Sequence, residues 1–150
     1  MNDEEILKVI EDLIETARDG AEGYRLAAES TEDHDLKRVL QTHSGQRQAF
    51  VSELQGLAAG YGGDVDTSSS AVGSLHRGWM NLKQALSSND RAAILEECQR
   101  GDEHAIESYE DALESPIPAS VQAAIRPQAD EIRAALAQMK TLADLNNTAG

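Results

Sequence analysis

The sequence predicts an all-α protein, a four-helix bundle with one further helix in a long central connection. Ala, Leu, Glu, Gln and Arg, which are good helix formers, are abundant, and runs of β-branched residues are absent. Apolar residues recur every three or four positions through long segments, which is the spacing of one helix face. Several residues of the first half recur 85 positions later. This recurrence indicates two similar helical hairpins.

The first hairpin begins with a helix over about residues 3–30, and Asp3 can cap its start. The polar run 30–33 predicts a turn with a new cap, and a second helix follows over about 34–59. The glycine-rich run 60–63 ends that helix.

A crossover is predicted over residues 60–90, with a loop rich in Gly, Asp and Ser followed by a helix over about 71–87. The apolar stripe of this helix consists of Val72, Leu75, Trp79, Leu82 and Leu86. We expect Trp79 to anchor the crossover to the bundle, because a large aromatic side chain buries much apolar surface.

The second hairpin begins with a helix over about residues 91–114, which the prolines in 115–118 stop. Its second helix covers about 119–144, where Pro127 predicts a kink, and 145–150 should form a frayed tail. We therefore expect one domain, with its parts at hairpin 3–59, crossover 60–90, hairpin 91–144 and tail 145–150.

The internal repeat is the most informative feature of the sequence. Residues that match at the offset of 85 include Glu11 with Glu96, Tyr24 with Tyr109, Ala27 with Ala112, and Leu57 with Leu142. One offset serves both helices of each hairpin, so the two hairpins have turns of equal length. The simplest arrangement relates them by a pseudo-twofold axis, and the long crossover makes the second and third long helices run in the same direction.

Composition restricts the partners and the compartment. The net charge of −14 and the absence of a basic patch disfavour binding to nucleic acid or to anionic lipid. Cys98 is the only cysteine, so no disulfide can form within the chain. The acidic N-terminus is unlike a secretory signal, and no apolar run approaches the roughly 20 residues of a membrane span. We expect a cytoplasmic protein that binds neither nucleic acid nor membranes; a homodimer and a high-salt habitat stay open.

Three segments resemble a protein family: Asp19-Gly20-Ala21-Glu22-Gly23-Tyr24, Leu75-His76-Arg77-Gly78-Trp79-Met80-Asn81-Leu82-Lys83 and Ala93-Ile94-Leu95-Glu96-Glu97-Cys98. With the hairpin repeat and the crossover, they make about residues 3–140 similar to an uncharacterised family of bacterial four-helix-bundle proteins within the ferritin-like superfamily. The resemblance implies a ferritin-like fold. It implies no particular chemistry, because that family has no assigned activity, although the analogy suggests a stress-related role.

Ferritin-like metal enzymes hold two iron or manganese ions. Two helices of the bundle each supply one Glu, and each of the other two supplies a Glu-x-x-His pair. In many members the single Glu lies seven residues before a Tyr. The positions that correspond here are Ala17, Asp102, the pair His43 and Gln46, and the pair Gln128 and Glu131. None of them keeps the ligand type of the family. The resemblance therefore implies that the di-metal site is largely lost.

Two interpretations of these central positions follow. A reduced site of His43, Asp102 and Glu131 could hold one iron or manganese ion. The favoured interpretation is a hydrogen-bonded polar layer without a cofactor, in which Asp102 pairs with Arg47 or with His43, because an unpaired buried charge is costly. The other expected members of this layer are Gln46, Gln128, Tyr24 and Tyr109. We accordingly expect a non-catalytic structural or interaction protein, with a metal-binding protein as the alternative.

The remaining candidates are weaker. His76, Arg77 and Asn81 lie on the polar faces of the predicted crossover helix and could form a partner surface. We expect Cys98 to be a buried inert thiol, and the pair Glu96 and Glu97 to face solvent.

Two alternative sites receive little support from the sequence. Glu22 and Glu107 could replace the missing metal ligands, but helix periodicity turns both away from the apolar stripes. His34 could suit a phosphotransfer bundle. Such a bundle needs a histidine in the middle of a helix, whereas His34 lies at a helix start, and it needs a glycine where this chain has Arg38.

Overall fold

The fold is all-helical, as predicted. A computed structural model describes residues 1–63, 77–88 and 90–149. Within these ranges the helices are α1 (Asp3–Ser30), α2 (His34–Ala59), the 3-10 turn η2 (Arg77–Trp79), α3 (Leu82–Ser88), α4 (Arg91–Glu114) and α5 (Ala119–Ala149). The predicted bounds of the first three long helices agree with those of α1, α2 and α4.

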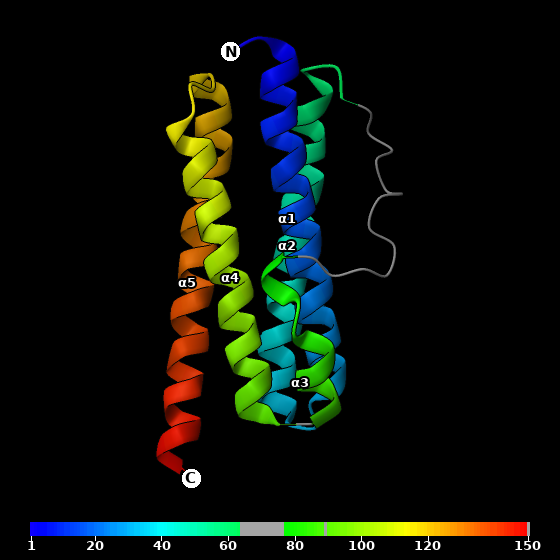
Figure 1. Cartoon of the computed structure of the whole chain (residues 1–150), viewed down its shortest axis with the longest axis vertical. Coiled ribbons are helices and arrows are strands. Elements are labelled where there is room, and N and C mark those ends of the chain that lie inside the picture. The colour runs from blue at the N-terminus through cyan, green and yellow to red at the C-terminus, as the bar shows by residue number, and fades with distance from the viewer. Residues whose placement is uncertain (64–76, 89, 150) are drawn as a thin grey trace.

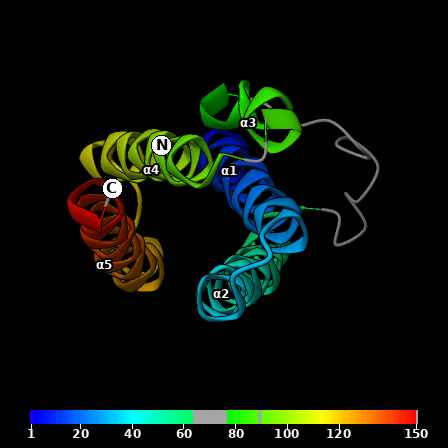
Figure 2. The same cartoon turned by 90° about the horizontal axis from the view of Figure 1, so that it is seen from below.

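The four long helices form two antiparallel hairpins, α1–α2 and α4–α5, that pack against each other chiefly through α1 and α4. The helices α2 and α4 run in the same direction, as a long crossover requires (Figure 1). Viewed along the bundle, α3 lies on the outside of α1 and α4 (Figure 2). Among neighbouring long helices, α2 and α5 pack least closely.

Polar side chains cap three of the helices at their N-termini. Asn2, rather than the expected Asp3, caps α1, because its side chain accepts a hydrogen bond from the Glu5 N–H at 2.8 Å. The Glu5 side chain in turn accepts from the Asn2 N–H at 3.1 Å, which completes a capping box. Asp33, the last residue of the predicted turn 30–33, caps α2, and Asp90 caps α4.

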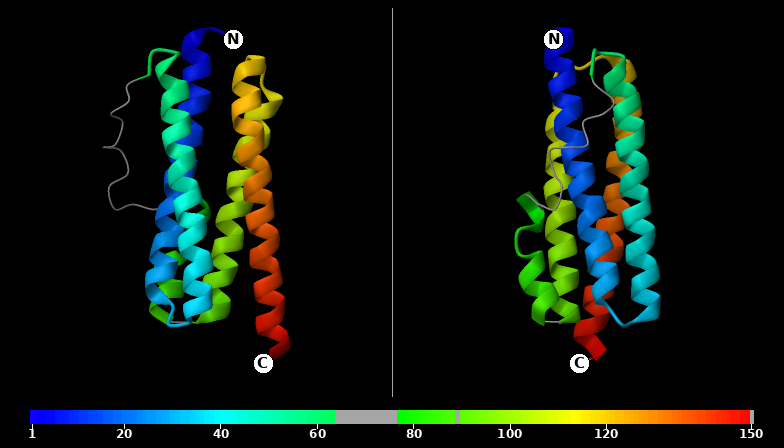
Figure 3. Two further views of the ribbon diagram at one scale, coloured as in Figure 1. Left: turned by 180° about the vertical axis from the view of Figure 1, so that it is seen from behind. Right: turned by 90° about the vertical axis from the view of Figure 1, so that its right-hand side faces the viewer.

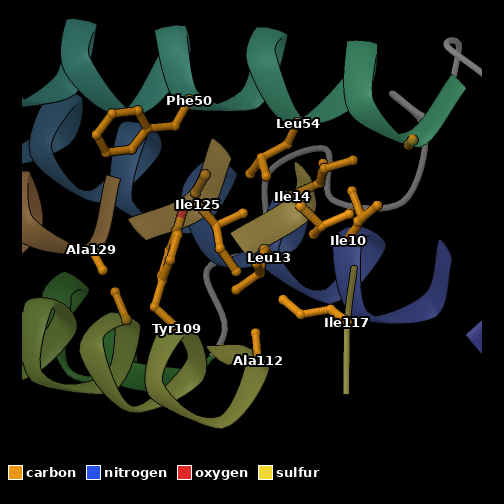
Figure 4. Packing of buried hydrophobic residues seen from close by; sticks show 14 of the residues in the cluster. Ile10, Leu13, Ile14, Phe50, Leu54, Tyr109, Ala112, Ile117, Ile125 and Ala129 are labelled. Carbon is orange, nitrogen blue, oxygen red and sulfur yellow. The ribbon is translucent and has the colours of Figure 1, made fainter. Parts of the chain in front are cut away.

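The buried apolar residues form two clusters, one toward each end of the bundle. The first cluster, whose packing Figure 4 shows, surrounds Phe50 and Ile125. The second surrounds Tyr24 and Trp79. On every long helix the residues of the two clusters are consecutive blocks, and on α1, α2 and α4 polar or small residues separate them. On α2, for example, His43 and Arg47 lie between the blocks, so the core contains a polar layer near its middle.

The crossover differs from the prediction of one helix over 71–87. Residues 64–76, which include Val72, Leu75 and His76, lie outside the described residues. In the part that the structure describes, a 3-10 turn and the short helix α3 replace a continuous helix. The reason lies in tertiary contacts with α4: Gly78 approaches the backbone of Gly101 closely, and the N–H of Asn81 donates a hydrogen bond to a side chain of α4.

The C-terminal segment also differs from the prediction, because α5 continues to Ala149 instead of fraying after 144. No glycine or proline interrupts the sequence between Pro127 and this end, so no strong helix stop is present. The last turns extend beyond the turn that joins α1 and α2 (Figure 3). Pro127 lies inside this helix, which continues on both sides of it.

None of the helices within the described ranges is long and apolar enough to cross a membrane.

Candidate functional site

A buried ion pair lies at the centre of the polar layer. Asp102, on α4, is 0% exposed, and its Oδ1 accepts a hydrogen bond from Nη1 of Arg47, on α2, at 2.9 Å. Its Oδ2 accepts from the hydroxyl of Tyr24, on α1, at 2.6 Å. Three helices are thus tied together at one carboxylate. Of the two partners expected for Asp102, Arg47 and His43, it is Arg47 that binds the carboxylate, and both carboxylate oxygens are engaged.

The Arg47 side chain is packed as closely as an apolar one. It is 1% exposed, and its guanidinium carbon lies 5.2 Å from the centroid of the Tyr24 ring. A Cβ at Gly20 would lie 3.0 Å from Nη1 of Arg47, so a glycine on α1 leaves room for the guanidinium. The half-buried Gln46 accepts a weaker hydrogen bond from Nε of Arg47 at 3.3 Å. The family-like segment around Gly20 therefore has a packing function.

The Tyr24 hydroxyl stays protonated under ordinary conditions. Burial raises the pKa of Tyr24 well above its usual value, and the negative charge of Asp102 raises it further. Burial likewise raises the pKa of the Cys98 thiol, with Asp102 as the second cause. Cys98 is buried and its thiolate is disfavoured, which agrees with the expected inert thiol.

His43 occupies the side of the layer that faces α5. Its Nε2 lies 2.7 Å from Oε1 of Gln138, and its ring centroid lies 5.2 Å from that of Tyr24. Burial lowers the pKa of His43, and the positive charge of Arg47 lowers it as well, against the opposing effect of the Gln138 contact. The imidazole is therefore neutral near pH 7.

A second polar chain crosses the bundle from Tyr109. The Tyr109 hydroxyl donates to Oε1 of Gln128, on α5, at 2.6 Å, and Nε2 of Gln128 donates to Oε2 of Glu53, on α2, at 3.0 Å. Burial raises the pKa of Tyr109 well above its ordinary value. The hydrogen bond between Gln128 and Glu53 joins α5 to α2, as does the contact between His43 and Gln138. These two helices are the pair of neighbouring long helices that pack least closely.

The three predicted metal ligands are not brought together. Asp102 and His43 both lie beside Tyr24, whereas Glu131 is exposed on the surface of α5. Among the residues that the structure describes, no three His, Cys, Asp or Glu side chains are grouped so that they could hold a metal ion. The donor set therefore does not fit an iron or manganese centre. Among the other candidates, His34 is an exposed first residue of α2, and Glu107 is exposed.

Trp79 anchors the crossover, as expected, and the structure shows how. Its ring is 3% exposed and packs between Gly23 of α1 and Gly101 of α4; a Cβ at either glycine would overlap it. The ring also meets the Tyr24 ring edge-on, at 5.3 Å between centroids. The crossover thus contacts the same tyrosine that binds Asp102.

Glu97 is a second anchor that the sequence did not reveal. We expected its side chain to face solvent, but Glu97 is 1% exposed. Its Oε2 accepts from the N–H of Asn81 at 2.6 Å, just before α3, and its Oε1 accepts from Nη1 of Arg100 at 2.6 Å. Asn81 belongs to the crossover and Glu97 to α4, so this hydrogen bond joins segments that are distant in the sequence. Asn81 itself is an exposed residue, and the side chain of Arg77 is outside the described part.

The comparisons with known proteins give a family without an assigned function. The sequence matches the family described as "Domain of unknown function (DUF2383)" over residues 5–115. This match covers most of the chain, so the protein belongs to that family. No curated protein matches the sequence.

Proposed function

We propose that this protein is a non-catalytic bundle of ferritin-like architecture, in which a buried polar layer replaces the metal centre and the fold serves a structural or interaction role. The parallel directions of α2 and α4 support this architecture. So does the internal symmetry of the side chains: Tyr24 contacts His43, and Tyr109 contacts Gln128, with each member of the second pair 85 residues after its counterpart.

One observation carries the proposal: the guanidinium of Arg47, 1% exposed, is bonded to Asp102 at the level where metal ligands would be expected. A divalent cation placed beside this carboxylate would meet a fixed positive charge, and charges repel strongly where water is excluded. Both oxygens of Asp102 are already engaged by Arg47 and Tyr24. Arg47 thus takes the place of a metal as the partner of Asp102.

The proposal is tested by adding Mn²⁺, Co²⁺ or anaerobic Fe²⁺ to protein that has been treated with a chelator. The expected result is an unchanged unfolding temperature, because a ligand that does not bind the native state cannot stabilise it. A rise in the unfolding temperature that Asp102→Asn abolishes would contradict the proposal and favour the metal-binding alternative. Glu107→Gln, which removes an exposed carboxylate from the same helix, is the matched control for non-specific binding.

A further inference from the structure

Two polar atoms of the layer lack a hydrogen-bond partner among the described residues. They are Nη2 of Arg47 and Nδ1 of His43. Both atoms are buried, in side chains of residues that are 1% and 8% exposed. Buried polar groups in native proteins are almost always hydrogen-bonded to protein or to ordered water, so each of these atoms needs a partner.

The chemistry of the two atoms is complementary. Oε1 of Gln138 is a carbonyl oxygen and can only accept, so the contact at 2.7 Å requires a proton on Nε2 of His43. In a neutral imidazole, Nδ1 then carries a lone pair and is an acceptor. Nη2 of Arg47 can only donate. The layer therefore presents one donor and one acceptor.

The two atoms also belong to the same part of the molecule. His43 and Arg47 are four residues apart, which places them on one face of α2. Both pack against Tyr24, with the His43 ring and the Arg47 guanidinium carbon each 5.2 Å from the centroid of its ring. They lie in the layer where α2 and α5 are joined by the hydrogen bond between His43 and Gln138.

We propose that one buried water molecule binds between His43 and Arg47, accepting a hydrogen bond from Nη2 of Arg47 and donating one to Nδ1 of His43. An oxyanion without a proton could accept from Arg47 but would repel the lone pair of Nδ1. A metal ion could bind Nδ1 but would face the charge of Arg47. A neutral hydroxyl-bearing molecule satisfies both groups, and water is the smallest one. This inference does not depend on the ferritin-like architecture proposed above.

The test is NMR on isotope-labelled full-length protein. Nitrogen chemical shifts report which nitrogen of His43 carries the proton, and cross-peaks with water report bound water molecules. The expected result is a neutral His43 with its proton on Nε2, together with cross-peaks of a long-lived water molecule at the His43 ring protons and at the Nε–H of Arg47. His43→Phe should remove the water cross-peak at Arg47. The control variant His34→Phe, at the exposed first residue of α2, should retain it.

Several outcomes would overturn the inference. A proton on Nδ1 of His43 would make that atom a donor. A direct hydrogen-bond coupling between Arg47 and Nδ1 without a water cross-peak would show that the two groups satisfy each other. A water cross-peak at Arg47 that persists in His43→Phe would place the water elsewhere. If His43→Phe does not fold, the tautomer of His43 and the water contacts in the wild-type protein still decide whether the proposed water is present.

Discussion

At the residue scale, the pairing of Arg47 with Asp102 is the contact on which the centre of the bundle depends. A buried ion pair is weak evidence for stability by itself, because desolvation of two charges opposes their attraction. Loss of one partner is different, since it leaves the other charge buried and unpaired. The cost of such a loss therefore measures how completely the layer excludes water.

Asp102→Asn should lower the free energy of unfolding by about 3–5 kcal/mol, because the charge of Arg47 then stays buried without its partner. Arg47→Met in the same chain removes that charge and replaces it with a flexible apolar side chain. The double variant should therefore lose much less stability than the sum of the two single variants. Urea unfolding measures all three, and additive losses would show that the two side chains do not interact.

His43 should make the stability depend on pH. Its pKa in the folded state is lowered from 6.5, so below about pH 6.5 the unfolded chain binds a proton that the folded protein excludes. Stability should therefore fall as the pH decreases from 6.5 toward the folded-state pKa, by at most about 1.4 kcal/mol per pH unit, and should not respond to this group above that range.

Urea midpoints of the wild-type protein and of His43→Gln at several pH values measure this dependence. The variant should have a shallower slope in the same range, because it lacks the titrating imidazole. His34→Gln changes an exposed histidine and provides the comparison for a general effect of losing a histidine. Equal slopes in wild type and His43→Gln would count against a buried, neutral His43.

At the element scale, the glycines of the helices divide into two kinds. A Cβ at Gly23 or Gly101 would overlap Trp79, whereas a Cβ at Gly45 or Gly56 of α2 would have nothing within 4 Å. A glycine in a helix interior costs about 1 kcal/mol relative to alanine, so only close packing compensates for it inside the molecule. The glycines that contact Trp79 have this compensation, and those of α2 do not.

Gly101→Ala should push Trp79 out of its position, because the added methyl group and the ring cannot occupy the same space. We expect a loss of about 1–3 kcal/mol and a red shift of the fluorescence of Trp79, the only tryptophan, with unchanged helix content by circular dichroism. Gly45→Ala is the matched control and should stabilise by about 0.5–1 kcal/mol without a change in fluorescence. A stable Gly101→Ala with wild-type emission would show that the crossover is not anchored as described.

At the scale of the whole molecule, the sequence predicted the long helices well because periodicity and capping residues are local signals. It also predicted that Asp102 needs a partner, but it could not choose between Arg47 and His43, since that choice depends on how helices pack. The burial of Glu97 and the partnership of His43 with Gln138 were missed for the same reason. Both involve segments far apart in the chain, and neither has a pattern of its own.

The crossover was predicted less well than the bundle. Its apolar spacing is compatible with one helix, and the residues that interrupt that helix act through contacts with α4. Gly78 is informative only once Gly101 is known to lie against it. Tertiary packing here overrides local helix propensity, as it often does in short segments.

We proposed that Arg47 has replaced a metal ion as the partner of Asp102. The most direct test is elemental analysis of protein purified without an affinity tag or a chelator. We expect no iron, manganese or zinc near one ion per chain. Near-stoichiometric metal in the wild-type protein that is lost in both Asp102→Asn and His43→Ala would contradict it, and would show that the layer binds a metal despite the guanidinium.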